Sequence, residues 1–536
     1  MTYPKLEDIL PADYEPFDSA DVEGTIPERF ARIVAHCSDR IAVSDAGSIT
    51  TYAELDRNSS AIAHEILKRL GPAPEPVALI FHAGAEYHTA QLGVLKSGKF
   101  FASLDFNLPA KRLLPLLKDL GPRLIICDDE SAEKAGELAR MLPECDVLVS
   151  SELDLTYDGP SDDIQISPDS FAYVVYTSGS TGPPEGVLIS HRSLLNLVRS
   201  HTNSMHLRKE DRGLQVCPLS YAASIGETFP ILLNGGAVFP FNLKDLGGKR
   251  LVEFLEKEKI TICSLVPVAF RVLVASLAAD QVLSDVRLIR LSGDRILKRD
   301  CVGFARHFSG RCVLRASYAS SEAQLCTGYF VHRGHMPDRE VVPAGFACQD
   351  TEIFIVDDEG NRLGPNETGE IVVRSRYMSS GYWNNPDLTA ERFSAGDVDG
   401  EQIYSTRDLG YFEPDGCLVH VGRKDARVKI YGKMVTITDV EEALLEADEI
   451  EQAVVVAVSR PETERFLAAY YIAEDGSQLA PAHIRSILRE SFPPEVVPKK
   501  IIRLGSFPVT ERNKIDRRRL ASEVHEFERE CLAAKR

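Results

Sequence analysis

Residues 171–186 read FAYVVYTSGSTGPPEG, and this stretch decides how the first half of the chain is interpreted. The apolar run FAYVV predicts a buried strand, and a helix is expected to start near Ser190. Between them lies YTSGSTGPPEG, in which glycines allow backbone N–H groups to face an anion and hydroxyls add donors. The stretch therefore predicts a phosphate-binding loop without the Walker spacing; an ordinary Gly/Ser surface loop is the alternative.

Around this loop, short apolar runs alternate with amphipathic stretches. The runs at 77–81, 124–127 and 171–176 predict strands, and the pattern that ends at Leu95 predicts a helix. This alternation is typical of a covered, mostly parallel sheet. From about Asp350, the segments TEIFIVDDEGNRLG and GEIVVRSR predict shorter strands of a small β subdomain. The expected fold class is therefore α/β for most of the chain.

The last hundred or so residues have a different pattern. DVEEALLEA predicts a helix, EQAVVVAVS and FLAAYYIA predict strands, and residues 481–490 predict a final helix. Together they predict a compact α+β unit. We expect an N-terminal domain at 1–424 and a small C-terminal domain at 425–536. No Pro-rich or Gly/Ser-rich linker separates them, so the joint is expected to be a short hinge.

Composition limits the possible partners. The 536 residues carry a formal net charge of −19, which repels nucleic acid and anionic membranes. No apolar run approaches the roughly 18 residues of a membrane helix, and the start MTYPKLEDIL lacks a signal pattern, so a cytoplasmic location is expected. The eleven cysteines form no CxxC pair and are interpreted as reduced, structural thiols. A catalytic Cys217 or Cys326 is the alternative.

Several motifs follow one another in a fixed order. They are TTYAELDRNSSAIA, VLKSGKFFASLDFNLPAKRL, the loop at 176–186, RASYASSEAQL, YSTRDLGYF, GRKDARVKIYGK and PVTERNKIDRRRL. This series resembles that of the adenylate-forming superfamily, which includes acyl-CoA synthetases, firefly luciferase and the adenylation domains of nonribosomal peptide synthetases. The resemblance covers nearly the whole chain, and its C-terminal part is most similar to stand-alone adenylation enzymes of the peptide-synthetase type. It implies a large domain followed by a small mobile lid domain.

The resemblance also implies ATP and Mg²⁺ as cofactors and assigns roles to individual residues. Tyr318 would stack on adenine, Glu322 would hold Mg²⁺ as a catalytic metal ligand, and Asp408 would bind the ribose hydroxyls. Lys514 would be the catalytic lysine, and Asp425 the hinge. The remaining ATP or AMP contacts would be Thr177, Ser178, Gly179, Ser180, Thr181, Gly182, Ala319, Ser320, Ser321 and Arg423.

The acyl pocket implied by the same resemblance contains mostly small residues. It would be lined by Tyr221, Ala222, Ala223, Gly226, Ser264, Arg290, Ser292, Ser317, Leu325 and Cys326. Amino-acid-activating members place an Asp where this chain has Ala222, so the substrate is expected to lack an α-ammonium. Arg290 could bind a second carboxylate or a polar tail of the acid; alternatively, it points to solvent or has a structural partner.

Three functions are compatible with these residues. The first is activation of a carboxylic acid as acyl-AMP with release of pyrophosphate, followed by transfer to the phosphopantetheine thiol of a carrier protein. The second is an acyl- or aryl-CoA synthetase. The third is a catalytically impaired nucleotide-binding homologue, because Glu185 stands where the superfamily has a phosphate-loop Lys, and Asn513 and Ala319 replace glycines. The expected partners are the acid and the thiol carrier, with neither nucleic acid nor a membrane.

Overall fold

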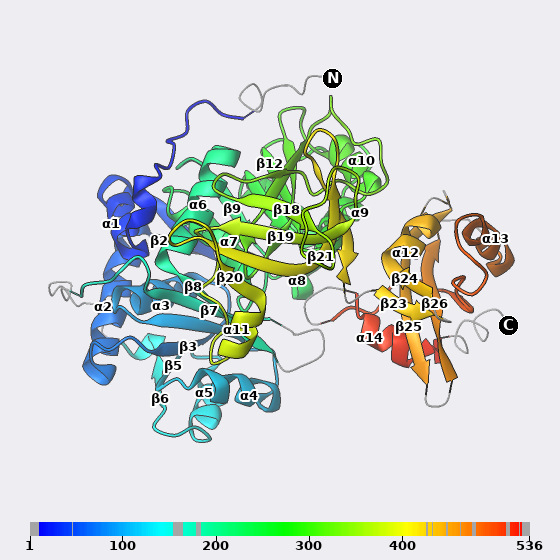
Figure 1. Ribbon diagram of the computed structural model, residues 1–536. Coiled ribbons are helices and arrows are strands. Elements are labelled where there is room, and N and C mark those ends of the chain that lie inside the picture. Colours follow the sequence, from blue (N-terminus) through cyan, green and yellow to red (C-terminus); the bar gives the residue numbers. More distant parts are fainter. Residues whose placement is uncertain are drawn as a thin grey trace.

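The protein is described here by a computed structural model. It describes residues 10–45, 47–153, 164–177, 184–424, 427–430, 433–445, 447, 449–460, 463–473, 479–510, 515–524 and 526–527. Figure 1 shows a larger body, coloured blue to yellow, beside a smaller body, coloured orange to red, that contains the last elements. The predicted fold class is confirmed: mostly parallel sheets, a small antiparallel sheet and an α+β C-terminal part are all present.

One mostly parallel sheet carries many of the expected acyl-pocket residues. Its strand order is β17-β16-β13-β12-β11-β9-β10-β1-β2, with parallel pairing from β13 to β1. The strands are β1 (Ile41–Asp45), β2 (Ser48–Thr51), β9 (Arg212–Gln215), β10 (Ala237–Pro240), β11 (Ile262–Leu265), β12 (Leu288–Ser292), β13 (Val313–Ser317), β16 (Thr327–Val331) and β17 (Phe346–Ala347). The carboxyl ends of neighbouring parallel strands therefore meet at one edge, where ligands bind in such sheets.

A second mostly parallel sheet carries the strand before the phosphate loop. Its order is β6-β5-β3-β4-β7-β8, and only β8 is antiparallel. The strands are β3 (Pro76–Phe81), β4 (Phe100–Asp105), β5 (Leu124–Cys127), β6 (Asp146–Val149), β7 (Phe171–Thr177) and β8 (Glu185–Ser190). All six residues of β3 are buried, which is why its sequence is a continuous apolar run.

Helices cover these two sheets. They are α1 (Ile26–Cys37), α2 (Tyr52–Leu70), α3 (Ala85–Lys96), α4 (Ala110–Leu120), α5 (Ala132–Ala139), α6 (His191–Met205), α7 (Ala222–Leu232), α8 (Leu243–Lys257), α9 (Pro267–Ala275) and α10 (Lys298–His307), with short 3₁₀ turns at Ala20–Glu23 and Ser150–Glu152. The TTYAEL motif starts α2: Glu54 N donates to Thr51 Oγ1 at 3.2 Å, and Thr51 N donates to Glu54 Oε2 at 2.8 Å. This capping box gives the motif an architectural role. None of the described helices could span a membrane.

The predicted β subdomain is an antiparallel sheet with the order β18-β19-β21-β20, and β22 pairs with β21. The strands are β18 (Glu352–Val356), β19 (Gly369–Ser375), β20 (Phe393–Ala395), β21 (Gln402–Phe412) and β22 (Leu418–Arg423); α11 (Pro386–Arg392) precedes β20, and β14 (Ala319–Ser320) pairs with β15 (Gln324–Leu325) as a separate hairpin. Strand β21 brings the YSTRDLGYF motif to the hairpin that carries RASYASSEAQL.

The smaller body has its own core. Its strands and helices are β23 (Arg427–Ile430), β24 (Lys433–Thr436), α12 (Ile437–Leu445), β25 (Ile450–Arg460), β26 (Thr463–Ala473), α13 (Pro481–Ser491), β27 (Lys500–Arg503) and α14 (Arg517–Ser522). Two apolar clusters pack on the two faces of the β25-β26-β27 sheet, and all their members come from residues 428–527. Asp425, the expected hinge, lies outside the described residues, so the boundary at 424/425 stays a prediction.

Ion pairs connect the two bodies. Arg295, which precedes α10, lies with Nη1 3.8 Å from Glu441 Oε2 and with Nη2 3.5 Å from Glu442 Oε1, both on α12. Arg299 Nη1 lies 3.8 Å from Glu451 Oε1 on β25. All three distances are longer than those of a good charge-assisted hydrogen bond, so these contacts are electrostatic and weak.

Candidate active site

The expected phosphate loop joins two paired strands. Thr177 ends β7, Glu185 begins β8, and the two residues are register partners, with Thr177 Oγ1 donating to the Glu185 carbonyl oxygen at 3.4 Å. The antiparallel pairing thus holds the two ends of the loop together. The predicted contacts Ser178, Gly179, Ser180, Thr181 and Gly182 lie outside the described residues, so their role stays a prediction.

Tyr318 and Asp408 meet although 90 positions separate them. Tyr318 directly follows β13, and its hydroxyl donates to Asp408 Oδ2 on β21 at 2.7 Å. The Tyr318 ring stacks on His420 of β22 with ring centroids 5.5 Å apart. Arg423, the register partner of Asp408, lies with Nη1 3.9 Å from Asp408 Oδ1. The structure therefore brings together three of the residues that were predicted to bind ATP or AMP.

The Asp408 carboxyl is held in its charged form. Burial alone would raise its pKa, but His420, the Tyr318 hydroxyl and the charge of Arg423 together outweigh burial and hold the pKa below its usual value. The side chain is only 14% exposed. A desolvated carboxylate that stays ionised is a strong acceptor for a pair of hydroxyl groups.

Glu322 lies in the turn between β14 and β15. Its Oε1 accepts a hydrogen bond from the Tyr382 hydroxyl at 3.0 Å, and its carbonyl oxygen accepts one from Ser379 N at 2.8 Å. Burial, followed by the charge of Glu322, raises the pKa of the Tyr382 hydroxyl, which therefore remains a donor. The described residues contain no cluster of three metal-ligating side chains. Glu322 could still hold Mg²⁺, since Mg²⁺ on a triphosphate usually takes only one or two carboxylates.

The other residues of this motif form a tight hairpin. Ala319 is exposed, Ser320 Oγ accepts a hydrogen bond from Ala323 N at 3.0 Å, and Ser321 offers its carbonyl to Gln324 Nε2 at 3.0 Å. The Ser320 and Ser321 acceptors are thus used within the hairpin. Cys326 follows the hairpin; burial raises the pKa of its thiol, which argues against the alternative of a catalytic cysteine there.

Glu185 lies within electrostatic range of Glu322. Burial raises the pKa of the Glu185 carboxyl, and the Glu322 charge raises it further, whereas Arg392 and Arg407 act in the opposite direction. The half-buried side chain adds negative charge at the loop that is expected to bind phosphates. The position of Glu185 therefore supports the expectation that a carboxylate in place of the lysine weakens ATP binding.

Glu185→Lys should raise kcat/KM for ATP about fivefold, because removing about 1 kcal/mol of repulsion has that effect on a rate. The measurement is ATP–pyrophosphate exchange at varied ATP concentration. Glu185→Gln is the matched control, and it should give part of the gain. The pKa of Glu185 is raised, so its carboxyl becomes protonated as the pH is lowered toward that pKa. The difference in kcat/KM for ATP between the parent and Glu185→Gln should therefore become smaller at lower pH. An unchanged or lower kcat/KM for Glu185→Lys would mean that the side chain has another role.

Register places the strand residues of the expected acyl pocket side by side. Ser264 on β11 pairs with Arg290 on β12, and Ser292 on β12 pairs with Ser317 on β13. Ser317 Oγ is enclosed and has no hydrogen-bond partner among the described residues. Such a polar atom at the end of a parallel strand is suited to contact a ligand.

Helix α7 supplies the opposite wall. Tyr221 is its N-cap, Ala222 and Ala223 form its first turn, and a Cβ added to Gly226 would lie 3.3 Å from Arg290 Nη2. Leu325 and Cys326 are both buried next to the hairpin. Arg290 is itself buried, which excludes the alternative that it points to solvent. The lining role of these residues remains a proposal.

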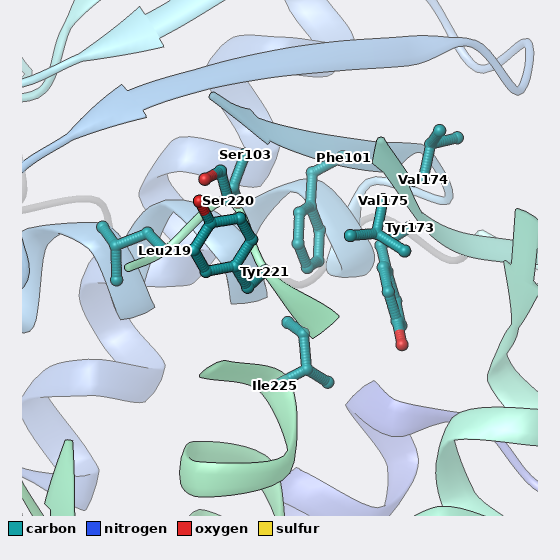
Figure 2. A pocket seen from close by; sticks show the side chains of 9 residues that line it. All are labelled: Phe101, Ser103, Tyr173, Val174, Val175, Leu219, Ser220, Tyr221 and Ile225. Atoms are coloured by element: carbon teal, nitrogen blue, oxygen red, sulfur yellow. The ribbon is translucent and has the colours of Figure 1, made fainter. Parts of the chain in front are cut away.

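A small cavity lies beside this wall (Figure 2). It is lined by Phe101, Ser103, Tyr173, Val174, Val175, Leu219, Ser220, Tyr221 and Ile225. Tyr221 is the one residue that it shares with the pocket predicted from the sequence. The Tyr173 hydroxyl is enclosed and lacks a hydrogen-bond partner among the described residues. The strand motifs gave no signal for this cavity because Phe101, Tyr173 and Val175 are ordinary apolar strand residues in the sequence.

Other contacts were also missed in the sequence. Tyr382, which holds Glu322, and His420, which stacks on Tyr318, stand outside the quoted motifs. A single Tyr or His in an otherwise ordinary strand or turn carries no local signature, so sequence reasoning could not have found either residue. Lys514 and Asp425 lie outside the described residues, and their assigned roles stay predictions.

Family models match two segments of the chain. One, described as AMP-binding enzyme, matches residues 30–383, and another, described as AMP-binding enzyme C-terminal domain, matches residues 439–514. Tyrocidine synthase 2 of Brevibacillus parabrevis is 27% identical over 501 residues, which cover 92% of this chain and 13% of that protein. The chain thus spans a small part of the length of this curated relative.

Two of the similar solved structures match this chain over nearly their whole length. The Klebsiella oxytoca NpsA structure, in complex with 3-hydroxyanthranilyl-AMSN, is 25% identical with a TM-score of 0.80 and covers 94% of this chain and 99% of that chain. The ATP-bound MatB structure from Rhodopseudomonas palustris has a TM-score of 0.79 at 18% identity and covers 93% of this chain and 99% of that one. The likeness to MatB concerns the fold alone.

Proposed function

Because the chain belongs to the AMP-binding enzyme family, we propose that it uses ATP to activate a carboxylic acid and then passes the acyl group to a phosphopantetheine thiol of a carrier protein. The observation that carries this proposal is the hydrogen-bonded pair of Tyr318 and Asp408 beside the strand ends that bear Ser292 and Ser317. A nucleotide site and an acid site would then share one edge of the sheet. Adenylate formation needs this adjacency.

In the first step, a carboxylate oxygen of the acid bonds to the α-phosphorus of ATP, the bond from that phosphorus to the bridging oxygen breaks, and pyrophosphate leaves. Two anions approach each other, so positive charge near the transferred group is the main requirement. Asp408 would fix the ribose, and Tyr318 would cover the adenine. Glu322 would hold Mg²⁺, which when bound would neutralise negative charge on the phosphates. Lys514 would bring a cation to the attacking carboxylate.

In the second step, the thiol attacks the acyl carbon, and AMP leaves as the carbon–oxygen bond breaks. The acyl-adenylate must be protected from water until then. We propose that residues 425–536 form a lid that turns about Asp425 between the two steps, as in the superfamily that the sequence resembles. The weak ion pairs of Arg295 and Arg299 with the smaller body are compatible with such a movement.

The acid should lack an α-ammonium group. Ala222 offers no acceptor where amino-acid-activating relatives have an Asp, and the buried carboxyl group of Glu227 on α7 already accepts hydrogen bonds from Val216 N and Cys217 N at 3.1 and 3.0 Å. An unpaired ammonium would lose several kcal/mol of hydration. We expect at least tenfold higher kcat/KM for hydroxy, keto, dicarboxylic or aliphatic acids than for any standard amino acid.

A panel of carboxylic and amino acids in ATP–pyrophosphate exchange tests this proposal. Ala222→Asp should depress activity on the preferred acid, because it places an unpaired carboxylate beside that acid. Ala222→Ser is the control for size and polarity without charge. A standard amino acid as the best substrate of the parent would contradict the expectation.

A second experiment compares acyl transfer to a holo-carrier protein with acyl transfer to CoA. It separates the proposed function from that of an acyl- or aryl-CoA synthetase. If no acid supports ATP–pyrophosphate exchange, the impaired homologue is favoured.

A further inference from the structure

The guanidinium of Arg290 is buried and makes no direct ion pair among the described residues. The residue is 7% exposed. Among the described residues it has no hydrogen-bond partner and no carboxylate oxygen within 4.0 Å. Its nitrogens are absent from the fully enclosed unpartnered atoms, so the remaining exposure is at the guanidinium itself. The charged end of the side chain therefore keeps some accessible surface.

Gly226 lies directly against the guanidinium. A Cβ added at this position of α7 would lie 3.3 Å from Arg290 Nη2 and 3.8 Å from Nη1. A side chain here would cover the guanidinium. On the sheet, Ser264 and Arg315 flank Arg290 in register, so the guanidinium lies between a small hydroxyl residue and a second cation.

The nearby groups leave an excess of positive charge. Arg315 is fully buried, and its hydrogen bonds go to the neutral partners Ser204 Oγ at 2.9 Å and Cys348 Sγ at 3.4 Å. Burial, with the charges of Arg290 and Arg315, lowers the pKa of His201 well below its usual value, so this imidazole is neutral.

Glu227 compensates this charge only in part, because it forms no ion pair with Arg290 within 4.0 Å. Burial raises the pKa of Glu227 to about 8 although the charge of Arg290 lowers it, and its Oε2 accepts hydrogen bonds from two backbone N–H groups. Burial lowers the pKa of Arg290 to about 10 although the charge of Glu227 raises it, and the guanidinium stays protonated at neutral pH. A buried cation without a partner is strongly unfavourable, whereas a bound anion with bidentate geometry would compensate it.

We propose that the acid activated by this chain carries a second anionic group, a carboxylate or a sulfonate, and that this group binds the buried guanidinium of Arg290. The proposal rests on the function proposed above, since the other end of the acid would react at the nucleotide. Arg290 precedes Ser292 by two strand residues, which corresponds to roughly 7 Å along β12. The two acidic groups should accordingly be separated by several bonds.

Matched pairs of acids test the proposal in ATP–pyrophosphate exchange. Succinate, glutarate and adipate are each compared with the corresponding monoamide, and 3-sulfopropanoate distinguishes sulfonate from carboxylate. We expect kcat/KM for the best dianion to exceed that of its amide or monoanionic analogue at least tenfold. Arg290→Met should reduce this ratio to near one. Arg250→Met, at an exposed arginine of α8, is the control and should keep the parent ratio.

Thermal unfolding gives a readout that does not need turnover. The preferred dianion should raise the melting temperature of the parent and of Arg250→Met, but not that of Arg290→Met, and the monoamide at the same concentration should raise none of them. Without ligand, Arg290→Met should melt no lower than the parent, because the substitution removes a buried charge that no direct ion pair compensates. A clearly lower melting temperature would indicate a structural role and would overturn the proposal.

The outcomes separate the two proposals. If no acid supports exchange but the dianion stabilises the parent and not Arg290→Met, the proposed function fails and the anion site stands. If monoamides react as well as dianions, or if Arg290→Met keeps the preference, the anion site is refuted while adenylate formation stands.

Discussion

Lys514→Ala should lower acid-dependent ATP–pyrophosphate exchange about 10²- to 10³-fold, the usual loss when one pre-placed charge is removed from a transition state. The reason is electrostatic: two anions approach in this step, and the terminal motif PVTERNKIDRRRL resembles the one that supplies the catalytic lysine. Lys514→Arg keeps the charge but changes its geometry, so it should recover part of the rate. Transfer of the acyl group from a preformed acyl-adenylate to the thiol should change far less, because that step does not join two anions.

The fold should survive this substitution. Val509 and Ile515 form a β-bridge across the segment that contains residue 514, and Asp516 N donates to the Pro508 carbonyl oxygen at 2.8 Å. Leu520 is buried in the core of the smaller body. Arg518→Ala, at an exposed cation four positions away, is the control for a general loss of positive charge. If Lys514→Ala exchanges near the parent rate, the lysine assignment is wrong.

Asp408→Ala should lower kcat/KM for ATP about a hundredfold or more, because two hydrogen bonds to a charged acceptor contribute about 1.5–3 kcal/mol each. The effect should fall mainly on kcat/KM for ATP and much less on the KM for the acid, since Asp408 lies on β21, which is not one of the strands of the acyl pocket, and contacts Tyr318 and Arg423. Initial rates of exchange at varied ATP and varied acid measure the two separately.

Asp408→Asn is the matched comparison. It keeps an acceptor for the Tyr318 hydroxyl but loses the charge, so its loss should be intermediate. The melting temperatures of both variants, compared with that of the parent, show whether loss of the hydrogen bond from Tyr318 destabilises the fold. If kcat/KM falls equally for ATP and for the acid, or if the variant unfolds, the result would argue against a ribose contact.

The parallel sheets could be predicted closely from the sequence. The run at 124–127 coincides with β5, and those at 77–81 and 171–176 differ from β3 and β7 by one residue. These strands are buried on both faces and are therefore continuous apolar runs between polar turns. The predicted helix at 481–490 corresponds in the same way to α13, because its apolar positions recur with helical spacing.

Site residues could be predicted only where they lie inside a recognisable motif. Tyr318, Glu322 and Asp408 could be proposed as site residues because each lies in a recognisable segment, but their partners Tyr382 and His420 are brought in by pairings between distant strands and turns. The position of Arg290 needed the register of β12, since a shift by one residue would have turned its side chain to the opposite face of the sheet. Register between distant strands is set by the whole sheet and is not encoded locally.

The long contacts of Arg295 and Arg299 with the smaller body have a kinetic consequence. The contacts with the partly exposed Glu442 and Glu451, at 3.5 and 3.8 Å, each contribute about 0–1 kcal/mol, which is close to thermal energy. Dissolved ions screen such pairs over roughly 8 Å at physiological ionic strength. Detachment of the smaller body should therefore become faster as salt is added, while the buried pair of Tyr318 and Asp408 is far less screened. Turnover limited by detachment would rise with ionic strength, whereas turnover limited by chemistry would not.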